Sequence, residues 1–206
     1  WGIFMLVILL GAGNGLRNGA MQNFDIARNA VFVWTHETTV PYEGFDAGRA
    51  IQLNNGDLPT LRQLDEVDVI APRLQVGNRF SGQALPIVRG EDSVAFAIMG
   101  DVPEFLDIKP YIIEQGRFLN DIDMERGRKV AVIGYAIGQK LFPFIDPIGR
   151  YVRLDGRKYQ VIGVFDEKKS AFGSNFDNYV LIPISTYLKT YGMVDRNGFS
   201  RSVNVT

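Results

Sequence analysis

The chain opens with an uncharged apolar run from Trp1 to Leu10. A helix that crosses a bilayer needs about 20 such residues, so these ten are too few on their own. We interpret the run as the second half of a transmembrane helix, with a buried core helix as the alternative. A signal peptide fits poorly, because the run has no initiating Met, no preceding basic segment and no clean cleavage site.

Three glycines, Gly11, Gly15 and Gly19, follow the run at four-residue spacing. Residues four apart share one face of a helix, and glycines on such a face let a second helix approach closely. The pattern therefore predicts a helix over residues 1–29 with a helix-packing face, and a flexible Gly/Asn loop is the alternative. A phosphate-binding loop is excluded, because no Gly-Lys-Ser/Thr sequence follows.

The next part of the chain predicts short elements separated by turns. Leu58, Leu61 and Leu64 repeat at helical spacing behind the turn sequence Asn54-Asn55-Gly56-Asp57. We expect a buried strand over 30–34, an extended loop over 35–48, a second strand over 49–53, a helix over 58–64 and a strand over 73–76.

From about Gly77 the pattern changes to β-branched segments and tight turns. Gly90-Glu91-Asp92 and Asp155-Gly156 each join two such segments and predict hairpins, the second with a type I′ turn. The expected strands are 84–89, 93–99, 129–133, 151–154, 159–164, 179–183 and 202–206, with a helix over 135–142. Many antiparallel pairings and few helices indicate an α+β fold.

Composition and charge remove several classes of function. Hydrophobic residues make up 46% and charged residues 22%, as in a folded globular protein. The net charge is -1 and no basic stretch is present, which argues against nucleic acid as a partner. The chain has no cysteine, so disulfides, thiolate nucleophiles and cysteine-ligated metals are excluded.

No group of residues predicts a catalytic or metal site. His36, the one histidine, lies in a predicted loop without partner residues. The acidic stretch from Asp121 to Glu125 lacks the glycine and glutamate spacing of a calcium loop, so we expect a solvated turn or a helix start. Ser170 and Ser174 lack the Gly-x-Ser-x-Gly elbow of a serine hydrolase. We expect no enzyme activity and no cofactor in this chain.

One block of the chain resembles a known family. Gly116-Arg117-Phe118 is followed by an acidic segment and then by Gly127 to Gly134, and these motifs resemble MacB-type ABC-transporter permeases in their periplasmic core domain, within the FtsX-like permease superfamily. The resemblance continues through further segments in order: Leu141-Phe142-Pro143, Asp146 to Arg150, Asp155-Gly156, Val161 to Val164, Lys168 to Ser174 and Leu181 to Ser185. These residues are turn glycines, prolines and apolar strand positions, so the motif is scaffold.

The resemblance implies a division of the chain into four parts. Residues 1–29 are the end of the first transmembrane helix and its periplasmic extension. Residues 30–77 begin a small α+β unit, called the porter subdomain in the family. Residues 78–186 form an inserted β-rich unit, the sabre subdomain, and residues 187–206 return to the porter unit, which the sequence leaves incomplete.

The resemblance also implies a function. The chain is expected to be the periplasmic-facing domain of a bacterial inner-membrane permease, transmitting ATP-driven motion for efflux. Expected partners are an ABC ATPase, a second permease copy, a periplasmic adaptor and an outer-membrane channel. Lipoprotein release, peptide sensing and, outside the family, a secreted hydrolase are the alternatives. Phe172, Phe176 and Tyr179 are candidate cargo or adaptor contacts, with burial in the core as the other reading.

Overall fold

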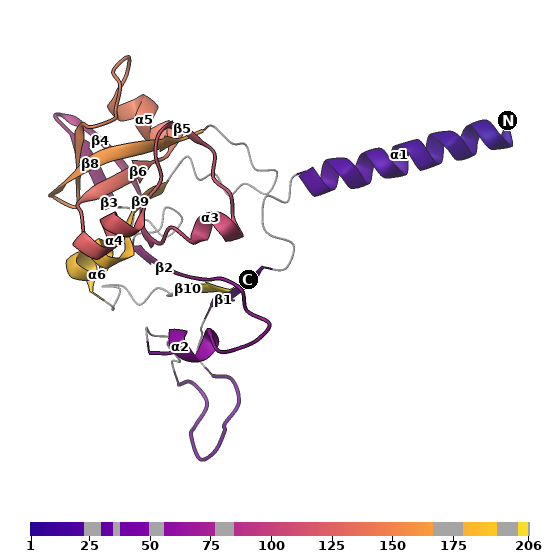
Figure 1. The fold of residues 1–206 in the computed structure, drawn as a ribbon, viewed down its shortest axis with the longest axis horizontal. Coiled ribbons are helices and arrows are strands. Elements are labelled where there is room, and N and C mark those ends of the chain that lie inside the picture. Colours follow the sequence, from indigo (N-terminus) through magenta and orange to yellow (C-terminus); the bar gives the residue numbers. More distant parts are fainter. Residues whose placement is uncertain are drawn as a thin grey trace.

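The computed structural model describes residues 1–22, 30–34, 38–49, 56–76, 85–166, 179–192 and 202–205 (Figure 1). Its helices are α1 Gly2–Gln22, α2 Leu58–Leu61, α3 Phe105–Ile108, α4 Asp121–Arg126, α5 Tyr135–Leu141 and α6 Ile184–Tyr191. Its strands are β1 Val31–Trp34, β2 Ile70–Val76, β3 Leu85–Arg89, β4 Asp92–Asp101, β5 Ile113–Gly116, β6 Val130–Ile133, β7 Tyr151–Leu154, β8 Arg157–Phe165, β9 Tyr179–Pro183 and β10 Ser202–Val205. The fold mixes helices and strands, as the sequence predicts.

Most of the strands form a closed ring. The hydrogen-bonded order runs β4-β3-β7-β8-β6-β9, and β9 pairs again with β4. The β4–β9 and β6–β8 pairs are parallel, whereas the other neighbours in the ring are antiparallel. Ring closure removes the unpaired edges that these strands would otherwise present.

The ring has an apolar interior because side chains alternate between the two faces of each strand. On β6, Ala131 and Ile133 face the inner cluster, whereas Val132 faces an outer cluster. On β9, Val180 is inner and Leu181 is outer in the same way. Both faces of these strands are buried, so their sequences read as continuous apolar runs.

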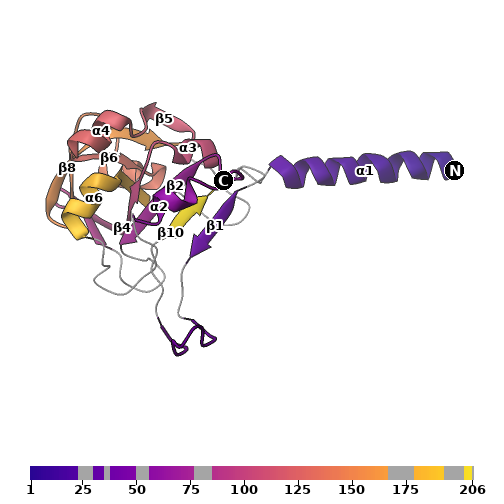
Figure 2. The same ribbon diagram turned by 60° about the horizontal axis from the view of Figure 1, so that its bottom comes forward.

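Helices close the ring and cover part of its outer face. Ile137 and Leu141 of α5 and Tyr187 of α6 belong to the inner cluster, so these two helices complete the core. The outer cluster joins Leu181 to Phe118 and to other side chains of the β5–α4 region. Figure 2 shows α4 and α6 beside the strands of the ring.

A smaller sheet is formed by segments from both ends of the described chain. Strand β10 lies between β1 and β2 and is antiparallel to both. Residues Ile70 to Arg73 of β2 pair with β10, whereas Leu74 to Val76 pair with β4. Strand β2 is therefore shared, and it connects the small sheet to the ring.

The two predicted hairpins are confirmed. Strands β3 and β4 are joined at Gly90, whose φ is 61°. Asp155 and Gly156 have φ values of 47° and 77°, the left-handed conformation that a type I′ turn needs at both central positions. The strand over 179–183 and the helix from Tyr135 also form as predicted.

Several predicted elements need correction. The strand at 30–34 is not buried, since the Val31 side chain is 59% exposed. Helix α2 ends at Leu61, short of Leu64. The strand predicted over 73–76 is longer, because β2 begins at Ile70. It includes Pro72, which lies opposite a residue of β10.

Other departures concern elements that the sequence did not predict. Strand β5 and helices α3 and α6 were missed. The acidic stretch is the helix α4, but its Asp123 is buried rather than solvated. The boundary expected at residue 186 stays a prediction, and this residue lies in α6. The strand expected over 49–53 lies outside the described residues except for Arg49, which is in a loop.

Helix α1 projects away from the ring and carries exposed apolar side chains from Trp1 to Leu10 (Figure 1). Among the described residues, no helix combines the length and the hydropathy needed to cross a bilayer.

Candidate functional site

The three glycines of the predicted packing face all lie in α1. A Cβ built on Gly11 meets no atom of another residue within 4 Å, so nothing in the described chain occupies the space beside it. Successive residues turn by about 100° in an α-helix, which places Gly15 and Gly19 along the same stripe.

The aromatic residues proposed as contacts are described only in part. Phe172 and Phe176 lie outside the described residues. Tyr179 is the first residue of β9, where it is half-buried and packs against the outer cluster of Phe118, Phe165 and Leu181.

The structure reveals a buried polar junction where β2 passes from the small sheet to the ring. Arg73 is the last residue of β2 that pairs with β10, and the next residue pairs with β4. The guanidinium of Arg73 binds the carboxylate of Asp101 at the end of β4, and its Nη2 donates to Tyr111 Oη at 2.7 Å. Its Cζ lies 3.6 Å from the centre of the Phe105 ring.

This junction joins three elements through one cation. Arg73 comes from β2, Asp101 from β4, and Phe105 from α3. Both members of the ion pair are buried, so their charges interact in a medium of low polarity. Within the described residues, Nε of Arg73 has no hydrogen-bond partner, so the guanidinium is held mainly through Nη2.

The ionisation of the junction follows from its surroundings. Burial opposes the positive charge of Arg73, but Asp101 and Tyr111 outweigh burial and hold the pKa of Arg73 above its ordinary value. Burial raises the pKa of the Tyr111 hydroxyl, so this group stays neutral and accepts the hydrogen bond from Arg73. Burial also raises the pKa of Asp101, and the neighbouring Arg73 guanidinium opposes that rise. The direct contact between the two groups is what indicates an ion pair.

A second buried carboxylate lies at the start of α4. Asp123 accepts from Arg117 Nη1 at 2.6 Å and contacts Arg128 Nη1 at 3.4 Å. It also forms a capping box with Asn120, in which each side chain accepts from the other residue's backbone N–H. Burial works against its charge, but the hydrogen bonds from Arg117 hold the pKa of Asp123 below 3.8.

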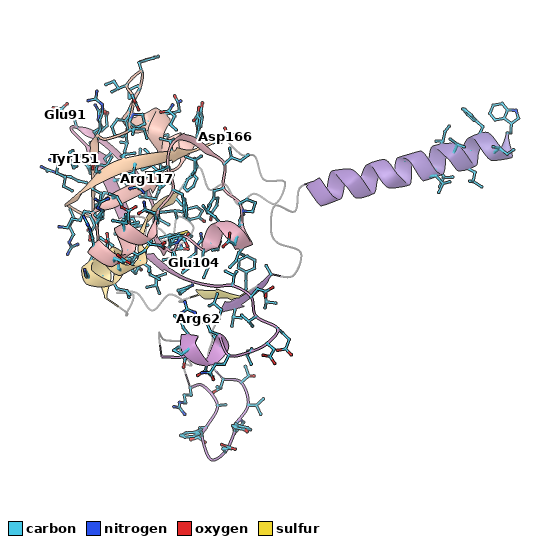
Figure 3. The ribbon with its side chains drawn as sticks, viewed as in Figure 1. Arg62, Glu91, Glu104, Arg117, Tyr151 and Asp166 are labelled. Atoms are coloured by element: carbon cyan, nitrogen blue, oxygen red, sulfur yellow. The ribbon has the colours of Figure 1, made fainter. Side chains whose placement is uncertain are left out.

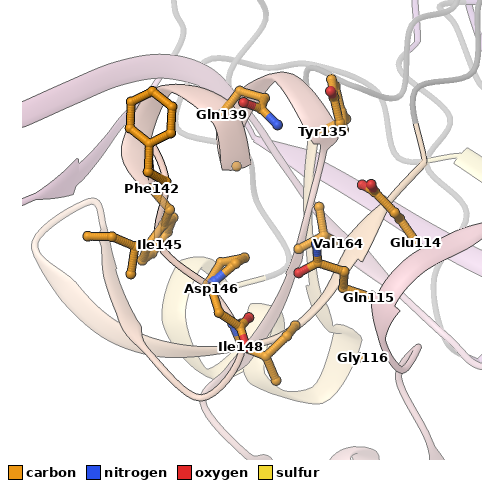
Figure 4. Close-up of a pocket in the computed structure, with 13 residues that line it drawn as sticks. Glu114, Gln115, Gly116, Tyr135, Gln139, Phe142, Ile145, Asp146, Ile148 and Val164 are labelled. Atoms are coloured by element: carbon orange, nitrogen blue, oxygen red, sulfur yellow. The ribbon is translucent and has the colours of Figure 1, made fainter.

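A cavity of ≈ 760 Å³ lies between β5, α5 and the loop that follows α5 (Figure 4). Glu114 and Gln115 line it from β5, Tyr135 and Gln139 from α5, and Asp146 from the loop. Asp146 Oδ1 already accepts from the backbone N–H of Ile148, which fixes the loop. Within the described residues, no group of three or more His, Asp or Glu side chains is placed to hold a metal ion.

The junction was not predicted from the sequence, although a signal was present. Arg73 interrupts the apolar segment Ile70 to Val76, and Asp101 ends the apolar run that starts at Val94. Charged residues in strands of this kind are buried only when they are paired. Pairing Arg73 with Asp101 needed the register of β2 against β4, which hydrophobic patterns alone do not specify.

Curated proteins similar to the chain are exporters. It is 25% identical over 185 residues to the pyoverdine export ATP-binding/permease protein PvdT of Pseudomonas aeruginosa. This match covers 89% of the chain and 26% of that protein. It is 29% identical over 200 residues to PvdT of Pseudomonas syringae pv. tomato, and this match covers 94% of the chain and 28% of that protein. It is 24% identical over 198 residues to the macrolide export ATP-binding/permease protein MacB of Bdellovibrio bacteriovorus. This match covers 95% of the chain and 29% of that protein. The chain thus spans little more than a quarter of these relatives.

Solved structures share the fold. The periplasmic region of MacB from Actinobacillus actinomycetemcomitans aligns with a TM-score of 0.64 at 22% identity, covering 88% of the chain and 76% of that structure. The extracellular domain of the ABC-type transporter YknZ from Gram-positive bacteria aligns with a TM-score of 0.63 at 17% identity. This alignment covers 85% of the chain and 83% of that structure. The family described as the MacB-like periplasmic core domain matches residues 1–206. The chain belongs to the MacB-like periplasmic core domain family.

Proposed function

We propose that this chain is the extracytoplasmic domain of an ABC exporter permease and that it transmits ATP-driven motion to a cargo. The match to the MacB-like periplasmic core domain over residues 1–206 carries the proposal. The similar PvdT and MacB proteins are named as export proteins with ATP-binding and permease parts, which favours export over lipoprotein release or sensing. ATP hydrolysis would belong to a nucleotide-binding domain, fused or separate.

Motion would enter through α1. In this proposal α1 continues a membrane helix, and the stripe of Gly11, Gly15 and Gly19 packs against a neighbouring helix of the permease. Close packing between helices makes the connection rigid, which transmission of motion requires. The open space beside Gly11 supports this role.

The small sheet and the ring would then serve as the porter-like and sabre-like units. Because β2 belongs to both, a displacement of the small sheet would reach the ring along one continuous strand. The Arg73 junction lies at the point of transfer and ties β2 to β4 and α3. Two such domains, one from each permease copy, would open and close against a periplasmic adaptor on the outer side of a bacterial inner membrane.

The test measures whether two copies move relative to each other when nucleotide binds. The chain contains no cysteine, so a single cysteine can be introduced and spin-labelled, provided that the remainder of the permease is also free of cysteine. Exposed Glu91 in the ring and exposed Arg62 near the small sheet are suitable sites, labelled in Figure 3. The full permease with its ATPase is reconstituted in nanodiscs, and the distances between the two labels are measured by pulsed EPR.

We expect the distance distribution at both sites to shift between the nucleotide-free state and the state trapped with ADP and vanadate. Vanadate without nucleotide is the control and should leave both distributions unchanged. Identical distributions in the two nucleotide states, in a sample that hydrolyses ATP, would overturn the mechanical role.

A further inference from the structure

The outer face of the β7–β8 hairpin is strongly basic. Residues 150–158 contain Arg150, Arg153, Arg157 and Lys158 but only one carboxylate, Asp155, a formal charge of +3 in a chain whose net charge is -1. Asp155 pairs with Arg157 at 3.6 Å. The charge of the hairpin therefore remains largely uncompensated by its own residues.

Two of these cations face each other on the surface of the ring. Val152 and Leu154 are buried in the inner cluster, so alternation along β7 directs Tyr151 and Arg153 outward. Arg153 lies directly opposite Lys158 in the register of β7 and β8. Like charges in this position destabilise an antiparallel pair.

The structure does not relieve this repulsion with acids. In the part of the chain that the structure describes, neither Arg153 nor Lys158 enters an ion pair. The Nζ atom of Lys158 instead lies 4.0 Å from the centre of the Tyr151 ring. The cation is thus held over an aromatic face and stays available to an anion.

These side chains line a hollow of ≈ 280 Å³. Arg153 and Lys158 make its lining basic, and Val88 and the Tyr151 ring add apolar surface. Arg89 lines it as well. The Arg89 guanidinium donates to the carbonyl oxygen of Leu141 and lies over the Phe142 ring, which fixes its position. No acidic residue is among the described residues that line the hollow.

We propose that this hollow is a docking surface for an acidic segment of a protein partner. Carboxylates of the segment would bind Arg153 and Lys158, and an apolar side chain beside them would cover Val88 and Tyr151. A hydrated inorganic anion has no apolar part to match these two residues, whereas a peptide does. The proposal deepens the proposed function, on which it rests for the expectation that a protein partner meets this domain.

The position of the hollow favours a protein over a membrane surface. Tyr151 lies on the side of the ring opposite α1 (Figure 3). If α1 leads to the bilayer, the hollow lies at the end of the domain that is far from lipid headgroups. This end is where a periplasmic partner would approach.

The test uses the full permease in nanodiscs and a synthetic peptide of alternating Glu and Leu residues that carries a neutral fluorescent dye. Binding is followed by fluorescence anisotropy at low ionic strength and then at increasing salt, because charge pairing at a surface is screened by salt. The test variant is R153E/K158E. The matched control is R62E/K129E, which makes the same change in charge at two exposed cations outside the hollow.

We expect R153E/K158E to bind the peptide at least about tenfold more weakly, equivalent to about 1.4 kcal/mol. The control should bind like the unmodified permease, and a peptide with Gln in place of Glu should not bind. Equal weakening in both variants, or none in R153E/K158E, would overturn the proposal. Displacement of the peptide by millimolar inorganic phosphate, or binding to phosphatidylglycerol vesicles that is lost in R153E/K158E, would also overturn it, since the site would then recognise phosphate.

Folding and the proposed function are controlled separately. Both substituted side chains are exposed. The R153Q/K158Q variant removes the charges without adding acids, so it should show an intermediate loss of binding. Its melting temperature should be no lower than that of the unmodified permease, because the repulsion between the two cations is removed. If the peptide does not bind but the spin-label distances still respond to nucleotide, the docking surface is wrong and the mechanical role stands.

Discussion

Tyr187 of α6 lies directly against Gly100 of β4: a Cβ built on Gly100 would be 2.7 Å from the Cβ of Tyr187. Atoms that close cannot coexist without a shift of the helix or the strand. Tyr187 is 3% exposed and belongs to the inner cluster of the ring. The absence of a side chain at Gly100 is thus what allows α6 to reach the core.

Replacing Gly100 with Ala should therefore destabilise the domain by about 1–3 kcal/mol, as overpacking in a core does. Urea unfolding followed by circular dichroism measures the change. Gly138→Ala is the matched control, because its added Cβ lies 3.5 Å from the nearest atom, an ordinary contact, and Ala favours the helix α5. A Gly100→Ala variant as stable as the unmodified chain would show that α6 is not fixed against β4.

Breaking the junction between Arg73 and Asp101 should be more damaging. Arg73→Met leaves the Asp101 carboxylate buried without its partner, and we expect a loss of about 3–5 kcal/mol in the free energy of unfolding. The double variant R73M/D101L removes both charges and should recover most of that loss. Arg157→Met breaks the exposed pair with Asp155 and should cost less than about 1 kcal/mol. Equal effects of Arg73→Met and Arg157→Met would contradict a buried junction.

The Asp123 cluster predicts sensitivity to acid. The pKa of Asp123 is lowered in the folded chain relative to its ordinary 3.8, so the charged carboxylate stabilises the fold above that pH. Its contribution is lost as the pH falls below 3.8 through the lower pKa of the folded state.

Asp123→Asn should remove about 1–3 kcal/mol near neutral pH, the cost of losing hydrogen bonds to a charged group. The stabilities of the variant and the unmodified chain should then converge as the pH falls. Thermal unfolding between neutral and strongly acidic pH measures both curves. Asp121→Asn, in the same turn of α4 but exposed, is the control. A constant difference at every pH would contradict the role given to the Asp123 charge.

The glycine stripe of α1 predicts a loss of coupling without a loss of folding. Gly15→Leu should abolish the nucleotide-dependent change in spin-label distance in the full permease, because the added side chain prevents close packing of the helix. Gly13→Leu is the control, since two residues turn a helix by about 200° and place Gly13 on the opposite side from Gly15. An unaltered change in spin-label distance in Gly15→Leu would contradict a role of the glycine stripe in coupling.

Local patterns predicted the elements whose residues determine their own conformation. Asp155-Gly156 produces its hairpin because both positions adopt left-handed backbone angles, and the strand at Val130 to Ile133 is apolar at every position. Helix α6 was missed because Ser185, Thr186 and Thr190 interrupt its apolar spacing. Two of these hydroxyls donate to carbonyl oxygens of the α4 region, Ser185 to Met124 and Thr186 to Arg128. Such contacts between distant segments have no local signature.

The candidate site was predictable in part for the same reason. The spacing of Gly11, Gly15 and Gly19 is local, so their shared helix face follows from the sequence, while its packing role stays a prediction. The Arg73 junction depends on Asp101 and Tyr111, which lie 28 and 38 residues further along the chain. The basic hollow likewise requires Val88 to pair with Arg153 across two strands that the sequence places in separate hairpins.

The closure of the ring determines when the domain can fold during synthesis. Strand β9 fills the gap between β6 and β4, and Tyr179 pairs with Ala97 across a long stretch of chain. Until residues 179–183 emerge from the ribosome, the edges of β4 and β6 that β9 will occupy have no partner and can recruit other strands. Pairings between such distant segments form slowly. The nascent chain therefore keeps these two edges unprotected until β9 has been made, after all the other strands of the ring.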